Sequence, residues 1–371
     1  MVGIQQPKKS LQLSSLQKLS AYIRILFIFP FTLLWHLAAS PFSDYHRRKP
    51  WRRRIVEIGL QALTALELTT AQTKLFQQGT THETYVAWAK NQHAPIQVDE
   101  LAHGGKIVWI GDRRREKVLL YMHGGGYIYP AQSPAYDFWG AMAERLVKSG
   151  KSVNVAALAY SLGDVGSFPL QLNQAVSAIQ YLMDLGYQPE DIVLVGESSG
   201  GNLILQILLH ILNPSPIADP LELPKKSKLA GALAVSAWVS FTSTKAASYA
   251  ENRHVDIITA FGYSGLSEVY LEGVPLSAYP YIDAASSTPA TWFEGLDGVV
   301  DKVLITAGKR ETSRDDIIKV GKQITQYHPR AKVIVQEDGL HADMFLDVPL
   351  NQQPPVKLTD DIFQWLKEVV D

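Results

Sequence analysis

The chain has 371 residues, a formal net charge of -1 and no cysteine. The near-neutral charge provides no global field that would attract nucleic acid, and the lack of cysteine excludes disulfide scaffolds, thiolate zinc sites and cysteine nucleophiles. Because 46% of the residues are hydrophobic and 19% are charged, the composition is that of a globular protein with a sizeable core.

An apolar segment lies near the N-terminus, within residues 22–39. Its most apolar part, Ile25–Ala39, is shorter than the roughly 20 residues that cross a bilayer, and the basic sequence HRRKPWRRR follows at 46–54. The basic flank and nearby tryptophans favour a membrane anchor or an interfacial helix. A helix that packs on the protein as part of a lid is the second interpretation. A cleaved signal peptide that ends at the small residues Ala38–Ser40 is the third.

The region that follows has weaker signals. Residues 55–76 have helical periodicity with few breakers, and residues 80–86 are expected to be a short linker or strand. Short apolar runs at 106–110 and 117–122 are separated by a polar tract, which predicts a hairpin or two adjacent strands. We expect residues 1–95 to be an N-terminal extension and residues 96–371 to form the main domain.

Beyond residue 150, short apolar runs alternate with segments of helical spacing. Strands are expected at 153–160, 192–195, 229–237, 303–307 and 332–336, and helices at 170–185, 203–212, 315–327 and 359–370. This alternation is typical of βαβ units. It predicts an α/β fold with a mostly parallel sheet covered by helices on both faces.

The sequence GESSG at Gly196–Gly200 lies directly between a predicted strand and a predicted helix. In that context Gly-x-Ser-x-Gly indicates a nucleophile elbow, a strained turn whose flanking glycines prevent collisions of Cβ atoms. Ser198 is therefore the candidate nucleophile. The alternative is a glycine-rich turn without catalysis, because the motif also occurs by chance.

The sequence HGGGY at His123–Tyr127 follows the predicted strand at 117–122. Consecutive glycines expose backbone N–H groups, which can stabilise the oxyanion of a tetrahedral intermediate. We assign the oxyanion hole to the N–H groups of Gly124, Gly125 and Ser199. A plain flexible loop is the alternative.

A serine hydroxyl needs a base, and the base needs an acid that orients it. His341 lies between the predicted strand at 332–336 and the terminal helix, and it is the candidate base. His328 lies in a polar turn next to proline and is expected at the surface. His210 lies inside a predicted helix and is expected to be a packing residue.

The candidate acids follow the predicted strand at 303–307. Glu311 stands in the loop at the strand end, whereas Asp315 and Asp316 have the position of first-turn helix residues, with Ser313 as N-cap. Carboxylates in a first turn have a structural reason to be there. We therefore favour Glu311 over Asp315 as the acid.

Together these segments resemble the hormone-sensitive-lipase group of α/β-hydrolases, in particular its fungal branch of steryl acetyl hydrolase-like proteins. The likeness covers about Val118–Val370 and includes HGGGY, the Phe168-Pro169 pair, GESSGGN at Gly196–Asn202 and SAWVSF at Ser236–Phe241. The chain departs from the usual pattern around the serine, where Glu197 and Ser199 replace Asp and Ala. Its acid loop, GKRETSRDD, also lacks the usual apolar pair.

The resemblance implies an α/β-hydrolase fold in residues 96–371, capped by the N-terminal extension. It implies a serine esterase that cleaves a short-chain ester, such as an acetyl ester, of a small lipophilic alcohol through Ser198, Glu311 and His341. It also implies a location at the endoplasmic reticulum membrane, with a cytoplasmic location as the alternative.

Other functions use the same residues. Acyl transfer or amide cleavage in a biosynthetic pathway needs the same nucleophile and oxyanion hole. A non-catalytic ligand-binding module on this scaffold is less favoured, because Ser198 and His341 are both present. No cofactor or metal is expected, since the sequence contains neither HExxH nor GxxxxGK, and no nucleic acid partner is expected.

Overall fold

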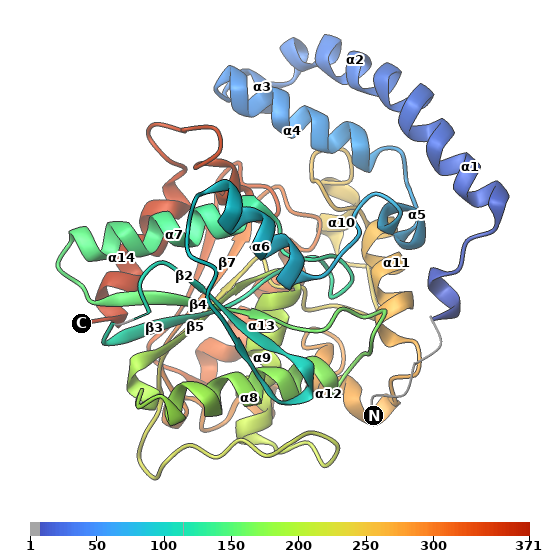
Figure 1. The fold of residues 1–371 in the computed structure, drawn as a ribbon. Helices are drawn as coiled ribbons and strands as arrows, with labels where there is room; N and C mark the ends of the chain where they lie inside the picture. Colours follow the sequence, from blue (N-terminus) through green and yellow to red (C-terminus); the bar gives the residue numbers. More distant parts are fainter. Residues whose placement is uncertain (1–7, 114) are drawn as a thin grey trace.

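The computed structural model describes residues 8–113 and 115–371 (Figure 1). At its centre is an eight-stranded sheet with the order β1-β2-β4-β3-β5-β6-β7-β8. The strands are β1 (Val98–Glu100), β2 (Lys106–Ile110), β3 (Lys117–Met122), β4 (Val153–Ala159), β5 (Ile192–Glu197), β6 (Leu229–Val235), β7 (Val300–Gly308) and β8 (Ala331–Gln336). The strands from β4 to β8 in this order pair in parallel, which confirms the expected mostly parallel sheet.

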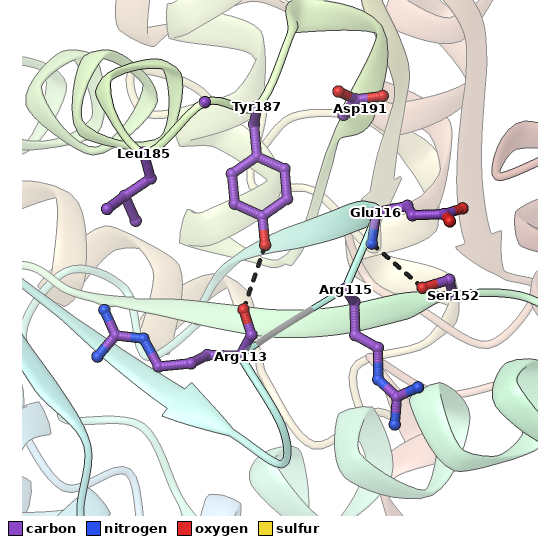
Figure 2. A pocket seen from close by; sticks show the side chains of 8 residues that line it. Arg113, Arg115, Glu116, Ser152, Leu185, Tyr187 and Asp191 are labelled. Carbon is purple, nitrogen blue, oxygen red and sulfur yellow. Dashed lines mark hydrogen bonds between the residues drawn. The ribbon is translucent and has the colours of Figure 1, made fainter.

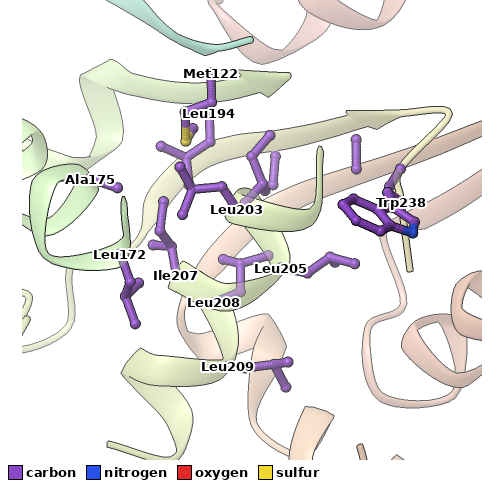
Figure 3. Packing of buried hydrophobic residues seen from close by; sticks show 14 of the residues in the cluster. Met122, Leu172, Ala175, Leu194, Leu203, Leu205, Ile207, Leu208, Leu209 and Trp238 are labelled. Atoms are coloured by element: carbon purple, nitrogen blue, oxygen red, sulfur yellow. The ribbon is translucent and has the colours of Figure 1, made fainter. Parts of the chain in front are cut away.

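Helices cover both faces of this sheet. One apolar cluster joins the sheet to α7 (Ser133–Lys148) and α14 (Lys357–Val369). The other joins it to α8 (Leu170–Asp184), α9 (Ser199–Leu212) and α13 (Arg314–Tyr327). Strand β5 contributes to both, because Val193 and Val195 face the first cluster and Ile192 and Leu194 face the second. Figure 3 shows Leu194 beside Leu203 of α9 in the second cluster.

The sheet order corrects one prediction. Strands β2 and β3 form neither a hairpin nor an adjacent pair, because β4 lies between them. β2 pairs with β4 antiparallel, and β3 pairs with β4 parallel after the crossover helix α7. All seven residues of β4 are buried, as expected for a strand covered on both faces.

The expected linker or strand at 80–86 is also wrong, because this segment forms helix α6 (Thr81–Asn91). The hydroxyl of Thr80 accepts the N–H of Glu83 at 3.2 Å, and the Glu83 carboxylate accepts the N–H of Thr80 at 2.7 Å. This reciprocal capping box starts a helix wherever Thr-x-x-Glu precedes an apolar run. The pattern is present in the sequence and outweighs the β-branched residues nearby.

From residue 8 to β1 the chain is mostly helical. It contains α1 (Ser15–Ile23), the π-helical turn η2 (Arg24–Ile28), α2 (Phe29–Ala39), α3 (Asp44–Arg47), α4 (Trp51–Thr64), α5 (Thr70–Lys74) and α6. The single helix expected at 55–76 is divided into α4 and α5 at Glu67, which has φ 47°. Helices α1 and α2 run along the outside of α4 and α5 (Figure 1). The remaining helices are α10 (Ala247–Glu251), α11 (Ala260–Leu271) and α12 (Tyr279–Ile282).

The helical run Ser15–Phe42 has a mean hydropathy of 1.7 over its most apolar window, of which 6% is buried. By length and composition alone it is sufficient to cross a membrane, and a signal sequence near the N-terminus has the same properties.

A buried charge cluster ties helix α4 to the segment after His341. Arg53 is 1% exposed, and its guanidinium contacts Glu57 at 2.8 Å, Asp347 at 2.8 Å and Asp343 at 3.0 Å. Tyr45 donates its hydroxyl hydrogen to Glu57 at 2.9 Å. A buried arginine that neutralises several carboxylates leaves them uncompensated when it is removed.

Arg53→Met keeps most of the side-chain volume but removes the charge, so it is expected to lower the free energy of unfolding by about 3–5 kcal/mol. Urea denaturation followed by tryptophan fluorescence measures this. The neighbouring Arg52 is exposed, so Arg52→Met is the matched control and should change stability by less than about 0.5 kcal/mol. Equal effects of the two variants would refute the structural role of the cluster.

Candidate active site

Ser198 lies in the turn between β5 and α9, with φ 53° and ψ -118°. Its N–H donates to the carbonyl of Val235 on β6 at 3.0 Å, and its own carbonyl accepts the N–H of Trp238 at 2.9 Å. A Cβ at Gly196 or Gly200 would collide with the carbonyl of Met122. The strained backbone of the elbow is therefore held by the neighbouring strands, as the motif predicts.

His341 and Glu311 are brought together by neighbouring strands. Glu311 follows β7 and His341 follows β8, and these two strands pair in parallel, so their carboxyl ends meet. Nδ1 of His341 lies 2.8 Å from Oε1 of Glu311, and both side chains are buried. A carboxylate at this distance assigns the proton to Nδ1 and leaves Nε2 free to act as a base.

The alternative acid lies elsewhere. Asp315 belongs to the first turn of α13, where its carboxylate accepts the N–H of Ser248 at 3.0 Å and pairs with Arg314. Ser313 precedes α13 at the N-cap position, but its hydroxyl makes no capping hydrogen bond. The contact of His341 with Glu311 favours the glutamate as the acid.

Asp256 is a residue that the sequence analysis missed. Its side chain is 2% exposed, and it accepts the backbone N–H of His341 at 3.1 Å and that of Thr312 at 2.8 Å. It thereby ties the histidine loop to the residue after Glu311. No local motif marks this aspartate, because both partners are distant in the sequence.

The carboxylates around His341 act on its protonation. Burial lowers the pKa of His341, but the hydrogen bond and charge of Glu311 and the charge of Asp256 raise it by more, so the net shift is upward. Burial and the negative charge of Glu311 raise the pKa of Asp256 to about 6. In its ionised form Asp256 favours the imidazolium form of His341.

Asp256→Asn is expected to move the acid limb of the pH profile of kcat/KM downward, because removing a negative charge lowers the pKa of the base. The expected shift is up to about one pH unit, and the amide that replaces one oxygen also loses a hydrogen bond, so kcat should fall about tenfold. Hydrolysis rates of a soluble ester between pH 4 and 9 measure both effects, at roughly half-unit steps.

The matched control is Asp283→Asn. Asp283 is equally buried and accepts the N–H of Phe241 at 3.0 Å and the hydroxyl hydrogen of Thr242. Its loss is expected to lower stability to a comparable extent without moving the acid limb. An identical pH profile for Asp256→Asn and the unmodified protein would exclude an electrostatic role for Asp256.

The glycine loop differs from the sequence-based assignment in one respect. The N–H of Gly124 donates to Oε1 of Glu197, which also accepts the hydroxyl hydrogen of Tyr121 at 3.0 Å. Burial raises the pKa of Glu197 to about 8, although these hydrogen bonds lower it. The N–H of Gly124, which we assigned to the oxyanion hole, is thus already occupied.

Gly125 and Gly126 follow with φ 100° and 60°. Within the described chain, no acceptor is found for their N–H groups or for that of Ser199. Positive φ values are readily adopted by glycine, and they turn successive N–H groups away from the usual strand direction. The donors available for an oxyanion are therefore those of Gly125, Gly126 and Ser199, and the third glycine of the motif is the signal that could have revealed Gly126.

His123 holds this loop in place. Its Nδ1 lies 2.6 Å from the carbonyl oxygen of Gly124, its Nε2 lies 2.8 Å from the hydroxyl of Thr81, and its ring stacks on Tyr160 at 4.0 Å. Burial lowers the pKa of His123 to about 4. A neutral imidazole can donate to the carbonyl and accept from the hydroxyl, so His123 links the glycine loop to helix α6.

A cavity of about 590 Å³ contains Ser198 and His341 together with Gly124, Gly125 and Gly126. The N-terminal extension supplies much of its apolar wall, through Ile25, Leu60, Leu63, Leu68 and Phe76. The two predicted reactive side chains therefore face the same space, which is mostly apolar. Binding sites for small molecules commonly combine an apolar wall with a few polar groups.

A second cavity, of about 780 Å³, lies at the amino ends of β3 and β5 (Figure 2). Ser152 lines it, but the hydroxyl of Ser152 accepts the N–H of Glu116 at 3.2 Å. None of the eight described residues that line this cavity is histidine. Although it is larger, it lacks the base that an activated serine requires.

The two histidines that were not chosen as the candidate base, His210 and His328, are both buried. His210 is 1% exposed and packs within α9, as expected. His328 is 2% exposed, so its predicted surface position is wrong. Its Nε2 lies 2.8 Å from the carbonyl oxygen of Val300, and its Nδ1 accepts the N–H of Arg330 at 3.1 Å. It thus satisfies the backbone where α13 leads into β8.

Sequence comparison gives related proteins with acetyl-hydrolase names. The steryl acetyl hydrolase family model matches residues 77–370. The chain is 24% identical over 259 residues to mug81, a steryl-acetyl-hydrolase-like protein of Schizosaccharomyces pombe, covering 65% of this chain and 64% of mug81. It is 24% identical over 216 residues to an acetyl-hydrolase of Streptomyces hygroscopicus, covering 56% of this chain and 62% of the relative. The matched regions thus span less than two thirds of these relatives.

Solved structures share the fold. A hormone-sensitive lipase from a metagenome library superimposes with a TM-score of 0.62 at 18% identity, covering 86% of this chain and 97% of the lipase. An esterase of the bacterial hormone-sensitive lipase family gives a TM-score of 0.58 at 21% identity, covering 79% of this chain and 93% of the esterase. From its fold and the extent of the family match, the chain is an α/β-hydrolase that belongs to the steryl acetyl hydrolase family.

Proposed function

We propose that the protein is a serine esterase that hydrolyses short-chain carboxylic esters, such as acetyl esters, of a small lipophilic alcohol. The observation that carries this proposal is that His341, paired with the buried Glu311, lines the same cavity as Ser198. Two relatives have names that refer to acetyl hydrolysis, which supports an acetyl group as the acyl group of the substrate. The apolar wall of the cavity supports a lipophilic alcohol.

The catalytic cycle follows from these positions. Ser198 Oγ attacks the ester carbonyl while Nε2 of His341 takes its proton, and Glu311 stabilises the imidazolium. The negatively charged oxygen of the tetrahedral intermediate accepts hydrogen bonds from the backbone N–H groups of Gly125, Gly126 and Ser199. When the intermediate collapses, the alcohol leaves with the proton from Nε2. Water, activated by the same histidine, then hydrolyses the acyl-enzyme and restores Ser198.

We further propose that the protein is associated with a membrane through its N-terminal helices. The apolar run Ser15–Phe42 and the basic segment after it support this. A location at the endoplasmic reticulum stays a prediction from the sequence resemblance, and a cytoplasmic location is its alternative.

Amide cleavage is the second candidate. A kynurenine formamidase of Meyerozyma guilliermondii is 35% identical over 112 residues, covering 30% of this chain and 39% of that enzyme. The same nucleophile and oxyanion donors serve ester and amide substrates. The leaving group therefore distinguishes the two functions.

Hydrolysis of matched substrates tests the proposal. We expect the highest kcat/KM for p-nitrophenyl acetate among the acetate, butyrate and laurate esters, release of sterol from a steryl acetate, and slower cleavage of p-nitroacetanilide. Cleavage of the anilide in preference to the acetate ester would favour the amidase. No turnover of any of these substrates, together with no labelling by a fluorophosphonate probe, would reject a serine hydrolase.

A further inference from the structure

The N-terminal run Ser15–Phe42 has two different faces. Buried or half-buried residues recur every three or four positions, at Ala21, Ile25, Phe29, Leu33, Leu37 and Ser40. Five large apolar residues between them form an exposed stripe, which we call the outer stripe: Leu26 (63% exposed), Phe27 (64%), Phe31 (75%), Leu34 (63%) and Trp35 (74%). One face thus packs on the protein, while large apolar side chains cover the other. Exposed apolar surface of this extent marks an interaction site.

The inner face belongs to the substrate cavity. Ile25 lines the cavity that contains Ser198 and His341, together with Leu63 of α4 and Phe76 beyond α5. Leu63 and Phe76 are 41% and 43% exposed, so this part of the cavity wall continues to the surface. The mouth of the cavity and the outer stripe are therefore both formed by the N-terminal helices, and they are adjacent at Ile25 and Leu26.

Arg24 ties the first half of the run to the protein. Its guanidinium donates to the carbonyl oxygen of Leu66 at 2.6 Å and to that of Glu67 at 3.2 Å. A run of 28 residues is about 42 Å long, and a spanning orientation would place its middle at the centre of the bilayer. Ile25 and the cavity would then lie at hydrocarbon depth, where the irregular loops of the domain could not be exposed to lipid.

We propose that the run Ser15–Phe42 lies in the plane of a membrane surface instead of spanning it, with the outer stripe in the lipid and Ile25 at the mouth of the cavity. An ester dissolved in the membrane then reaches Ser198 sideways, past Ile25, Leu63 and Phe76. The substrate part of this inference rests on the proposed function, whereas the orientation of the helix does not.

Basic residues supply the matching charge for anionic headgroups. Lys18 lies within the run, and Arg47, Arg48 and Arg52 follow it on the exposed surface. Arg47 and Arg48 each form an ion pair at this surface, with Asp44 and Asp338, so among the described residues the unpaired charge comes from Lys18 and Arg52. Trp51, which is 61% exposed, contacts the guanidinium of Arg52, and tryptophan is favoured at headgroup level. A helix held at a membrane surface combines apolar side chains in the lipid with such basic residues at the headgroups, and here the opposite, apolar face packs on the protein instead of facing water. This charge favours a lipid surface over a second copy of the chain as the occupant.

The chain contains no cysteine, so single cysteines report the orientation directly. Ser15→Cys, Phe31→Cys and Lys148→Cys place a thiol at the start of the run, in the outer stripe and on the exposed surface of α7. Each full-length variant is added to preformed sealed vesicles of phosphatidylcholine and phosphatidylserine and treated with a membrane-impermeant maleimide. We expect full labelling of Ser15→Cys and Lys148→Cys, and protection of Phe31→Cys that requires the vesicles.

Three results would overturn the orientation. Protection of Ser15→Cys until detergent is added would mean that the run spans the bilayer. Labelling of Phe31→Cys in the presence of vesicles would mean that the outer stripe does not enter lipid. A disulfide-linked dimer of Phe31→Cys formed efficiently under oxidation in vesicles would assign the stripe to a second copy.

Kinetics tests the sideways route. The measured quantity is kcat/KM for an acetate ester carried in the vesicles, divided by kcat/KM for soluble p-nitrophenyl acetate. Phe31→Glu is expected to lower this ratio at least about tenfold, because it places a charge in the lipid-facing stripe. Leu276→Glu is the matched control, since Leu276 is 77% exposed and lies outside the cavity wall, and its ratio should stay unchanged.

An unchanged ratio for Phe31→Glu would reject membrane delivery of the substrate. If the unmodified protein did not hydrolyse a soluble ester, the proposed function would be rejected instead. The labelling pattern would still determine the orientation of the helix.

Discussion

Ser198→Ala is expected to lower kcat for p-nitrophenyl acetate by about 10⁶-fold, because the variant has no oxygen that can form the acyl-enzyme. The backbone of the elbow is held by the bonds of residue 198 to Val235 and Trp238, so the fold should persist without the hydroxyl. Activity that remains should come from the oxyanion donors and from binding alone. Labelling by a fluorophosphonate probe should disappear together with turnover.

The adjacent serine provides the control. Ser199 is fully buried. Ser199→Ala keeps the backbone N–H that we assign to the oxyanion hole, so kcat should stay within about tenfold of that of the unmodified protein. If Ser198→Ala retained full activity and labelling, the nucleophile would have to be sought elsewhere.

Glu311→Gln is expected to lower kcat by about 10⁴-fold, the size of effect that follows when a catalytic histidine is held in the wrong tautomer. Oε2 of Glu311 accepts the N–H of Gly308, while Oε1 faces Nδ1 of His341. A glutamine at this position keeps its oxygen toward Gly308 and turns its NH₂ group toward Nδ1. His341 then has to carry its proton on Nε2, where it cannot act as a base.

Asp315→Asn is the matched control for the choice of acid. Asp315 stabilises the start of α13 through Ser248 and Arg314, so its loss should change kcat by less than about tenfold, although it should lower the free energy of unfolding by about 1 kcal/mol. Steady-state kinetics and urea denaturation of both variants separate the two effects. A larger loss of kcat for Asp315→Asn than for Glu311→Gln would reverse the assignment.

The strand-turn-helix geometry around the candidate nucleophile could be predicted because it is local. The elbow at Ser198 needs a strand, two glycines and a helix within about ten residues, and all of these are adjacent in the chain. The same holds for the glycine loop after β3. His341 and Glu311 could be predicted to lie close together because each follows the end of a strand. Neighbouring parallel strands have their carboxyl ends at the same edge of the sheet.

The alternation of apolar runs and helical segments determined the fold class, but the pairing of strands required the tertiary structure. β4 separates β2 from β3 in the sheet. Because all three strands are apolar, their sequence pattern does not indicate which of them lies between the other two. Helix α6 is a different case, because the Thr-x-x-Glu pattern of its capping box is present in the sequence and predicts a helix, although the β-branched residues nearby favour a strand.

Within the site, the sequence by itself determined which residue types carry the chemistry, and the tertiary structure decided their partners. The bond between Gly124 and Glu197, the contacts of Asp256 with His341 and the cluster around Arg53 join segments that lie 73, 85 and 294 residues apart. Hydrogen bonds and charges act over a few ångströms in space, whatever the separation along the chain. A local motif therefore indicates a candidate nucleophile, whereas the electrostatic environment of that residue is established only when the chain has folded.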